Sequence, residues 1–212
     1  MSAVCTALTL RIAPGQEAAY RVWLAGSLPS LLPVYERVGI TAKTVMIAGP
    51  RVIAHYEATR EGAVEEALAA PESVALLAGP LAGLLDQTFT PVVFPEVFAW
   101  QVPATYPVER AGLLLNIRPG AEEPYRNWLA NTAVGQLADI WDRSEIARHD
   151  VLINGTNVVA FYECAMRYNV LKAFRDPEAL VVLFSDLAPL LDLDPTMPMS
   201  LFEEAFHWHA AS

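Results

Sequence analysis

The sequence predicts an α+β protein built from two tandem ferredoxin-like βαββαβ units, and three observations support this fold class. One pattern of residues occurs twice along the 212-residue chain. Within each copy, short apolar runs alternate with helical patterns in the order β-α-β-β-α-β. The strands are apolar on both faces, which predicts a sheet covered on both sides. We therefore expect a first unit at residues 1–100 and a second at 110–212, joined by a linker at 101–109.

The repeat is identified from matched segments. Leu8–Gly15 recurs 105 residues later as Leu113–Gly120, and Ala54–Glu57 recurs 106 residues later as Ala160–Glu163. The Glu-x-Phe-x-Trp pattern that ends the first copy also ends the second. Small changes in offset are typical of loops, which tolerate insertions. The chain is therefore expected to fold as a pseudo-dimer within one polypeptide.

The first strand of each copy, at about 5–12 and 111–117, ends before a Pro-Gly pair that predicts a turn. A helix follows each strand. In the second copy it begins near Pro124, because proline is favoured at the first helical position. Its counterpart in the first copy contains Pro29 and Pro33, which predict a broken helix.

The second and third strands are expected to form a hairpin. It turns near Gly49 in the first copy and at Asn154-Gly155 in the second, a pair that favours tight turns. A second helical region follows at about 62–85 and 168–191, interrupted in both copies at a Pro-Glu pair. Two sheets packed face to face would cover each other, so we expect a fused α+β barrel.

Composition excludes several classes of protein. The net charge is −10, from 14 basic and 24 acidic residues, which disfavours nucleic acid as a partner. No signal-peptide pattern and no apolar run of 18 residues occurs, so we expect a cytoplasmic protein without a membrane partner. Cys5 and Cys164 occupy unrelated positions of the two copies and are expected to be buried thiols, not a disulfide or zinc ligands.

Three strand segments carry a resemblance to a known family. They are Leu10–Gly15, Val52–Ala58 and Glu96–Trp100. With these segments the sequence resembles the dimeric α+β barrel superfamily, and within it the tetracenomycin-type aromatic polyketide cyclases and the SchA/CurD-like polyketide proteins. The resemblance extends over nearly the whole chain, twice. It implies a fused dimeric α+β barrel, an aromatic polyketide as substrate and no cofactor.

Polar positions that differ between the copies are the first candidates for chemistry. Arg11 aligns with Asn116, and His55 aligns with Phe161. Imidazole titrates near neutral pH, so His55 is the best candidate for a general acid or base. Strand parity places Glu57 on the same face, where it could orient the ring. The alternatives are a half-buried structural histidine, and an Arg11 that pairs with Glu57 or extends its charged end to solvent.

Aromatic residues occupy equivalent positions of both copies and suit either core packing or a flat aromatic ligand. They are Tyr20, Trp23, Tyr35 and Tyr56, with Tyr125, Trp128, Trp141 and Tyr162. Tyr20 and Tyr56 carry the hydroxyls best placed to reach a pocket. His149 and Asp150 are adjacent on a strand and should face opposite ways, so no dyad is expected. His207 and His209 face one way but lack a third metal ligand.

These residues lead to three hypotheses about function. The first is a cofactor-independent aromatic polyketide cyclase in which His55, Arg11 and Tyr20 are catalytic, while Tyr56, Trp23, Tyr35, Glu57 and Asn116 bind the substrate. The second is a cofactor-free monooxygenase that oxidises a phenol or anthrone to a quinone. The third is a non-catalytic polyketide-binding protein. We expect the working pocket in the first half, no metal, and an intrachain pseudo-dimer that is compatible with further homodimer formation.

Overall fold

The computed structural model describes residues 3–192 and 200–210. Its eight strands follow the hydrogen-bonded order β1-β3-β2-β8-β5-β7-β6-β4, which closes into a barrel. Strands and helices follow the β-α-β-β-α-β order twice, so the predicted fused dimeric α+β barrel is confirmed. Contacts divide the chain into two units. One runs to Val93 and resumes at Glu204, and the other spans Phe94–Glu203.

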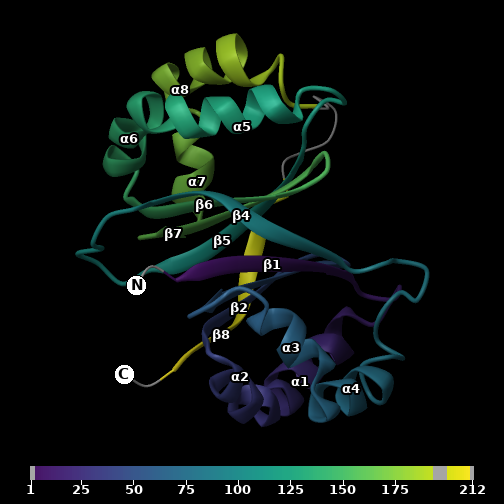
Figure 1. Cartoon of the computed structure of the whole chain (residues 1–212). Coiled ribbons are helices and arrows are strands. Elements are labelled where there is room, and N and C mark those ends of the chain that lie inside the picture. Colours follow the sequence, from purple (N-terminus) through teal and green to yellow (C-terminus); the bar gives the residue numbers. More distant parts are fainter. Residues whose placement is uncertain (1–2, 193–199, 211–212) are drawn as a thin grey trace. The chain divides into compact units, whose positions relative to one another are not determined.

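The first unit combines three strands from the start of the chain with most of the last strand. The strands are β1 (Val4–Arg11), β2 (Ile40–Ala48), β3 (Arg51–Ala58) and β8 (Phe202–His209). Its helices lie on one side of these strands (Figure 1). They are α1 (Glu17–Ser27), the 3₁₀ turn η1 (Leu28–Leu31), α2 (Leu32–Val38), α3 (Ala63–Ala69) and α4 (Pro71–Ala78).

The second unit repeats this arrangement. Its strands are β4 (Val92–Gln101), β5 (Glu109–Asn116), β6 (Ile146–Asn154) and β7 (Asn157–Cys164). Its helices are α5 (Glu122–Asn131), α6 (Ala133–Arg143), α7 (Tyr168–Ala173), α8 (Pro177–Val182) and the π-helical turn η2 (Leu183–Leu187). They too gather on one side of their sheet (Figure 1).

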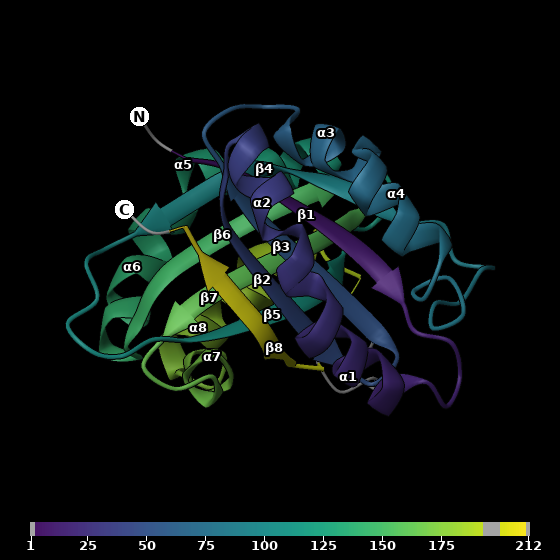
Figure 2. The ribbon, with the colours of Figure 1, turned by 90° about the horizontal axis from the view of Figure 1, so that it is seen from below.

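Each repeat ends in a strand that extends the sheet of the other repeat. Strand β4 follows the first repeat in sequence but pairs with β6, with Trp100 opposite His149. Strand β8 follows the second repeat, and Figure 2 shows it beside β2, its neighbour in the strand order. The compact units therefore differ from the expected ranges 1–100 and 110–212, because each unit contains most of the strand that ends the other repeat.

The predicted helix breaks are present. The first helix of the first repeat is divided into α1, η1 and α2, with prolines near the starts of η1 and α2. Gly39 ends α2 with φ 91°, in the left-handed region that favours glycine. A Cβ at this position would lie 2.5 Å from the hydroxyl oxygen of Thr59. The helix therefore has to end at a glycine before β2 begins.

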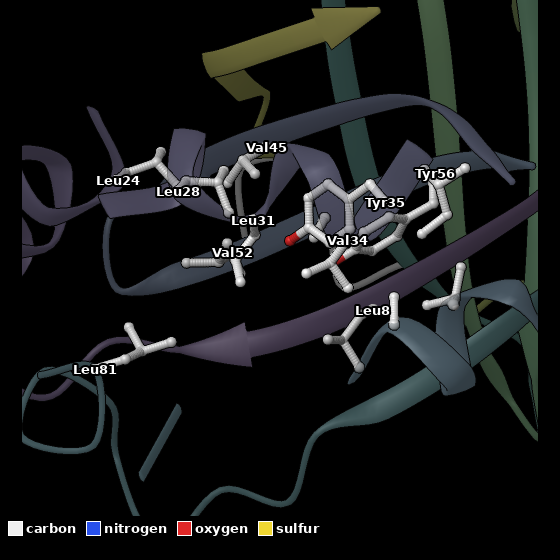
Figure 3. Packing of buried hydrophobic residues seen from close by; sticks show 14 of the residues in the cluster. Leu8, Leu24, Leu28, Leu31, Val34, Tyr35, Val45, Val52, Tyr56 and Leu81 are labelled. Carbon is white, nitrogen blue, oxygen red and sulfur yellow. The ribbon is translucent and has the colours of Figure 1, made fainter. Parts of the chain in front are cut away.

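The core of the first unit lies between its helices and its sheet. Leu8 on β1, Val45 on β2 and Val52 on β3 belong to one buried cluster with Leu24 and Leu28 from the helices (Figure 3). Strand parity places His55 on the opposite face of the sheet from Val52 and Tyr56. The second unit buries two clusters in the same position relative to its own helices. Among the described residues, the helices are all too short or too polar to traverse a membrane.

Candidate functional site

A pocket lies between the helices and the sheet of the second unit. It has an empty volume of about 780 Å³, counting its opening to solvent. Strands contribute Leu115, His149 and Tyr162, and the helices contribute mainly aromatic and aliphatic side chains. None of the described residues that line it is Asp, Glu, Lys or Arg. The pocket therefore suits an uncharged, largely apolar ligand.

His149 is a buried polar residue of this pocket. It lies on β6 with 8% of its surface exposed, and neither Nδ1 nor Nε2 has a hydrogen-bond partner. Its ring stacks on Tyr162 with centroids 4.4 Å apart and planes at 13°, and Trp141 packs edge-on at 5.0 Å. Desolvation lowers the pKa of His149 to about 4, although the charge of Asp150 opposes the shift. The imidazole is therefore neutral at physiological pH, with one donor and one acceptor available to a ligand.

The walls of the pocket present flat aromatic faces. Tyr125 and Trp128 on α5 stack with centroids 6.2 Å apart and planes at 14°. Trp141 on α6 also packs against Trp100 of β4, at 4.7 Å. All four aromatic positions of the second copy, these three and Tyr162, line the pocket. Burial raises the pKa of both tyrosines well above its usual value, so their hydroxyls stay protonated.

A short chain of hydrogen bonds fixes one of these aromatic walls. The indole N–H of Trp128 donates to Gln136 Oε1 at 3.1 Å, and Gln136 Nε2 donates to Asp186 at 2.7 Å. Gln136 belongs to α6 and Asp186 to the π-helical turn, so three helical segments share the contact. Trp23, the counterpart of Trp128 in the first copy, has no partner for its buried indole nitrogen.

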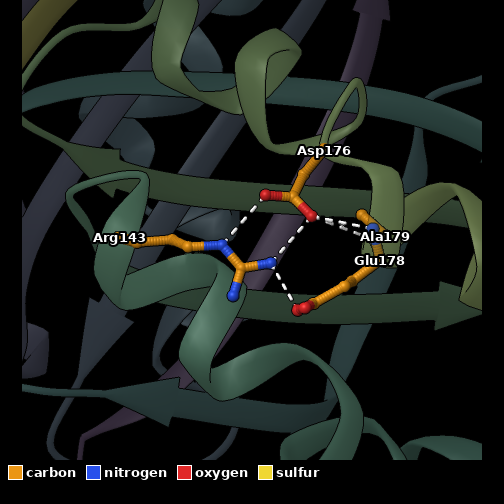
Figure 4. A network of polar contacts seen from close by, with 4 residues as sticks. All are labelled: Arg143, Asp176, Glu178 and Ala179. Carbon is orange, nitrogen blue, oxygen red and sulfur yellow. Dashed lines mark hydrogen bonds and ion pairs between the residues drawn. The ribbon is translucent and has the colours of Figure 1, made fainter.

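A second network joins α6 to α8, two of the helices that line the pocket (Figure 4). Arg143 at the end of α6 donates to both carboxylate oxygens of Asp176, at 2.9 and 2.7 Å, and to Glu178 at 2.6 Å. Asp176 also caps α8 by accepting from the backbone N–H of Glu178 and Ala179. The arginine hydrogen bonds lower the pKa of Asp176 to about 2. Because α6 and α8 both line the pocket, this network helps to fix its width.

The structure does not bring the expected catalytic residues together. His55 is buried on β3 opposite Ala7 of β1, and Arg11 lies four residues further along β1, about 13 Å away at the usual rise per residue. Arg11 is half-exposed and pairs with Asp86 at 3.6 Å, not with Glu57. Tyr20 is buried on the helix side of the sheet, and His55 faces away from it, so the three residues do not share one environment.

The expected substrate-binding residues are also divided between faces. Tyr35 and Tyr56 are buried in the helix-side cluster of the first unit, and Trp23 packs against that cluster. Glu57 is partly exposed on the same face as His55, as parity predicted. Asn116 is exposed at the end of β5. The aromatic members therefore form one environment, and the polar members do not join it.

Sequence reasoning missed Lys43. This residue is 5% exposed on β2, and its ammonium donates to the Tyr35 hydroxyl at 2.7 Å. The repeat offset of 106 aligns Lys43 with His149, so both copies place a nitrogen base at one position on the helix side of the sheet. The alignment itself was the signal that could have identified it.

Two other expectations are confirmed. Arg148 bonds to Asp150 at 2.8 Å on one face of β6, while His149 faces the pocket on the other, so His149 and Asp150 form no dyad. Cys5 and Cys164 are buried and are not joined in a disulfide.

Comparisons with known proteins identify the fold. No family model and no curated sequence matches the chain. Among solved structures, a candidate monooxygenase from Fusobacterium nucleatum has a TM-score of 0.66 at 6% identity, covering 98% of this chain and 94% of its own. One from Lactobacillus acidophilus has a TM-score of 0.62 at 10% identity, with 99% and 97% covered. An anthrone oxidase-like protein has a TM-score of 0.63 at 11% identity, with 100% and 95% covered. At these identities the similarity is one of fold, and the fold is that of the dimeric α+β barrels.

Proposed function

We propose that this chain is a cofactor-independent monooxygenase that binds an aromatic polyketide phenol or anthrone in the pocket of the second unit and oxidises it to a quinone. The observation that carries the proposal is His149, a neutral imidazole without a partner in a pocket of aromatic faces. A flat fused-ring ligand would pack between those faces and place a hydroxyl or carbonyl on the free ring nitrogen.

The proposed oxidation requires a base and an apolar pocket that holds the substrate. His149 would accept a proton from the ring methylene or phenol of the substrate, and the resulting anion would transfer an electron to molecular oxygen. The oxygen then adds to the carbon of the ring methylene. Its O–O bond breaks, and water leaves. The methylene becomes a carbonyl, so one substrate and one O₂ give one quinone and one water. The stacked Tyr162 would hold the imidazole against the substrate.

Three further points support this proposal. The strand motifs resemble those of proteins that tailor aromatic polyketides, which supplies the substrate class. The compared structures include an anthrone oxidase-like protein and two candidate monooxygenases. The pocket presents parallel aromatic planes and no cation, and a preformed flat ring fits this better than an extended poly-β-ketone chain does.

Oxygen uptake with 1,8-dihydroxyanthrone tests the proposal. The purified protein should raise the rate of oxygen consumption above the spontaneous rate, and one atom from labelled O₂ should appear in the quinone. His149→Phe keeps the ring shape and should abolish the increase. His55→Phe, which copies the equivalent residue of the second repeat, serves as the matched control and should retain it. Equal loss in both variants, or loss only in His55→Phe, would place the chemistry on the other face of the sheet.

A cyclase remains the second candidate, because the resemblance of the strand motifs includes the tetracenomycin-type cyclases and the same base could form an enolate for ring closure. The two reactions differ in their products. Cyclisation with dehydration releases water without consuming oxygen, so ring formation under anaerobic conditions would select the cyclase. Ligand binding without turnover in either assay would select the polyketide-binding protein.

A further inference from the structure

Lys43 in the first unit is a buried amine without a counter-ion. Its ammonium nitrogen lies 4.7 Å from the ring centroids of both Tyr35 and Tyr56 and donates one hydrogen bond, to the Tyr35 hydroxyl. No Asp or Glu of the described chain pairs with it. An ammonium group has three donors, and the described residues provide one hydrogen-bond acceptor for it, the Tyr35 hydroxyl, while the faces of the two rings attract the charge. Burying an unpaired charge is costly, and a packed core gains nothing from it.

The position of Lys43 in the repeat corresponds to a pocket residue in the second copy. Lys43 aligns with His149, Tyr56 with Tyr162, and Trp23 with Trp128, and the second-copy residues of all three pairs line the pocket. Trp23 supplies an independent observation, since its indole N–H is buried and lacks a partner. The first unit therefore has two donors short of acceptors, at positions equivalent to the pocket residues of the second unit.

We propose that the helix side of the first unit is a second ligand site, centred on Lys43, that binds an aromatic carboxylate. A carboxylate provides the missing negative charge and enough lone pairs for the remaining ammonium protons. The aromatic part of the ligand matches the rings of Tyr35, Tyr56 and Trp208, the last of which lies 6.2 Å from Tyr35 and is partly exposed. The described lining of the second-unit pocket contains no Lys or Arg, so that pocket suits an uncharged ligand. The two sites are therefore expected to bind ligands of different charge.

Ligand binding at this site should be coupled to proton uptake. Desolvation lowers the pKa of Lys43 to about 7, and the titratable groups that face it are the hydroxyls of Tyr35 and Tyr56, which burial keeps protonated. At pH 8 most of the free protein therefore holds a neutral amine. A bound carboxylate stabilises the ammonium form, so the complex takes up close to one proton.

Titration calorimetry with salicylate on the full-length protein at pH 8 tests the proposal, using two buffers of different ionisation enthalpy. We expect saturable binding of one salicylate per chain with uptake of close to one proton, and at least tenfold weaker binding of the neutral analogue salicylamide. Lys43→Met should lose salicylate binding and raise Tm, because it removes the unpaired amine without leaving a cavity. His149→Phe should bind salicylate as the wild type does.

Several results would overturn the proposal. These are the absence of saturable binding to the wild type, binding without proton uptake, and unchanged binding in Lys43→Met. Loss of salicylate binding in His149→Phe but not in Lys43→Met would assign the acid to the second-unit pocket instead. The wild-type proton uptake does not depend on any variant, so a poorly folding Lys43→Met would still leave a decisive measurement. Oxygen uptake with the anthrone reports on the other unit, so failure of one proposal leaves the other standing.

Discussion

Replacing His149 with phenylalanine should stabilise the protein while removing its pocket chemistry. In the wild type both ring nitrogens are buried without partners, and an unsatisfied buried polar group costs about 1–3 kcal/mol. Phenylalanine keeps the ring that stacks on Tyr162 and removes that cost. At pH 8 we therefore expect the free energy of unfolding to rise by about 1–3 kcal/mol. For a chain of this size each kcal/mol corresponds to roughly 2–4 °C in Tm.

The same variant makes a prediction about pH. The pKa of His149 is about 4 in the folded protein and about 6.5 in the unfolded chain. Between these values the unfolded state binds more protons, so the wild type loses stability as the pH falls below about 6.5. Phenylalanine does not titrate, so its advantage over the wild type should grow by about 2 kcal/mol between pH 8 and pH 5. Urea denaturation at the two pH values measures both numbers.

The outcome that would refute this reasoning is a variant less stable than the wild type at pH 8, or a stability difference that does not change between pH 8 and pH 5. Either result would mean that the imidazole has a polar partner in solution or remains hydrated in the pocket. The matched control is Tyr162→Phe, which keeps the stacking and leaves His149 in place. Its stability should follow the pH dependence of the wild type.

Three further predictions concern the scaffold, two of them the helices around the pocket and the third the end of α2 in the first unit. Asp176→Ala should lower the urea midpoint of unfolding, because it removes the α8 cap together with the Arg143 partner. Arg143→Gln should lower that midpoint less, because the arginine side chain is 40% exposed. Gln136→Leu removes the hydrogen bonds to Trp128 and Asp186, so it should weaken the binding of an aromatic ligand several-fold with little change in Tm. Tryptophan fluorescence measures the affinity, and an unchanged affinity would exclude a positioning role for Gln136. Gly39→Ala should lower Tm more than Gly15→Ala does. Both glycines have positive φ, but only at Gly39 would the added carbon lie 2.5 Å from Thr59 Oγ1. Equal decreases in Tm would refute the steric argument.

The elements of the fold could be predicted because their signals are local and occur twice. Pro29 and Pro33 break a helix wherever they occur, and strand parity correctly separated His149 from Asp150. The exchange of β4 and β8 could not be predicted. An apolar strand pattern specifies a half-buried or buried strand, but many neighbours satisfy its backbone hydrogen bonds equally well.

The candidate site was harder to predict, because the polar positions that differ between the two copies do not mark the pocket. Arg11 and His55 differ from Asn116 and Phe161, yet Arg11 is a half-exposed residue beside Asp86. A residue's chemistry depends on what surrounds it, and the sequence alone does not reveal that His149 lacks partners. The aromatic positions were interpreted as packing or ligand contacts, and in the second unit the buried rings pack together and also line the pocket.

Lys43 and His149 together argue that the two copies diverged by changing one residue type at a shared ligand position. Each side chain is buried and each lowers stability near or below neutral pH, because desolvation lowers the pKa of both. A leucine or methionine would pack at least as well at either position, so core packing alone gives no reason to keep a base in both copies. Ligand binding supplies that reason, since a bound acceptor or donor satisfies the group that the apo core leaves unpaired. Aromatic neighbours occur at the equivalent positions of both copies, so the two proposed sites share these rings, and we expect the identity of the base to determine the charge of the ligand that each binds.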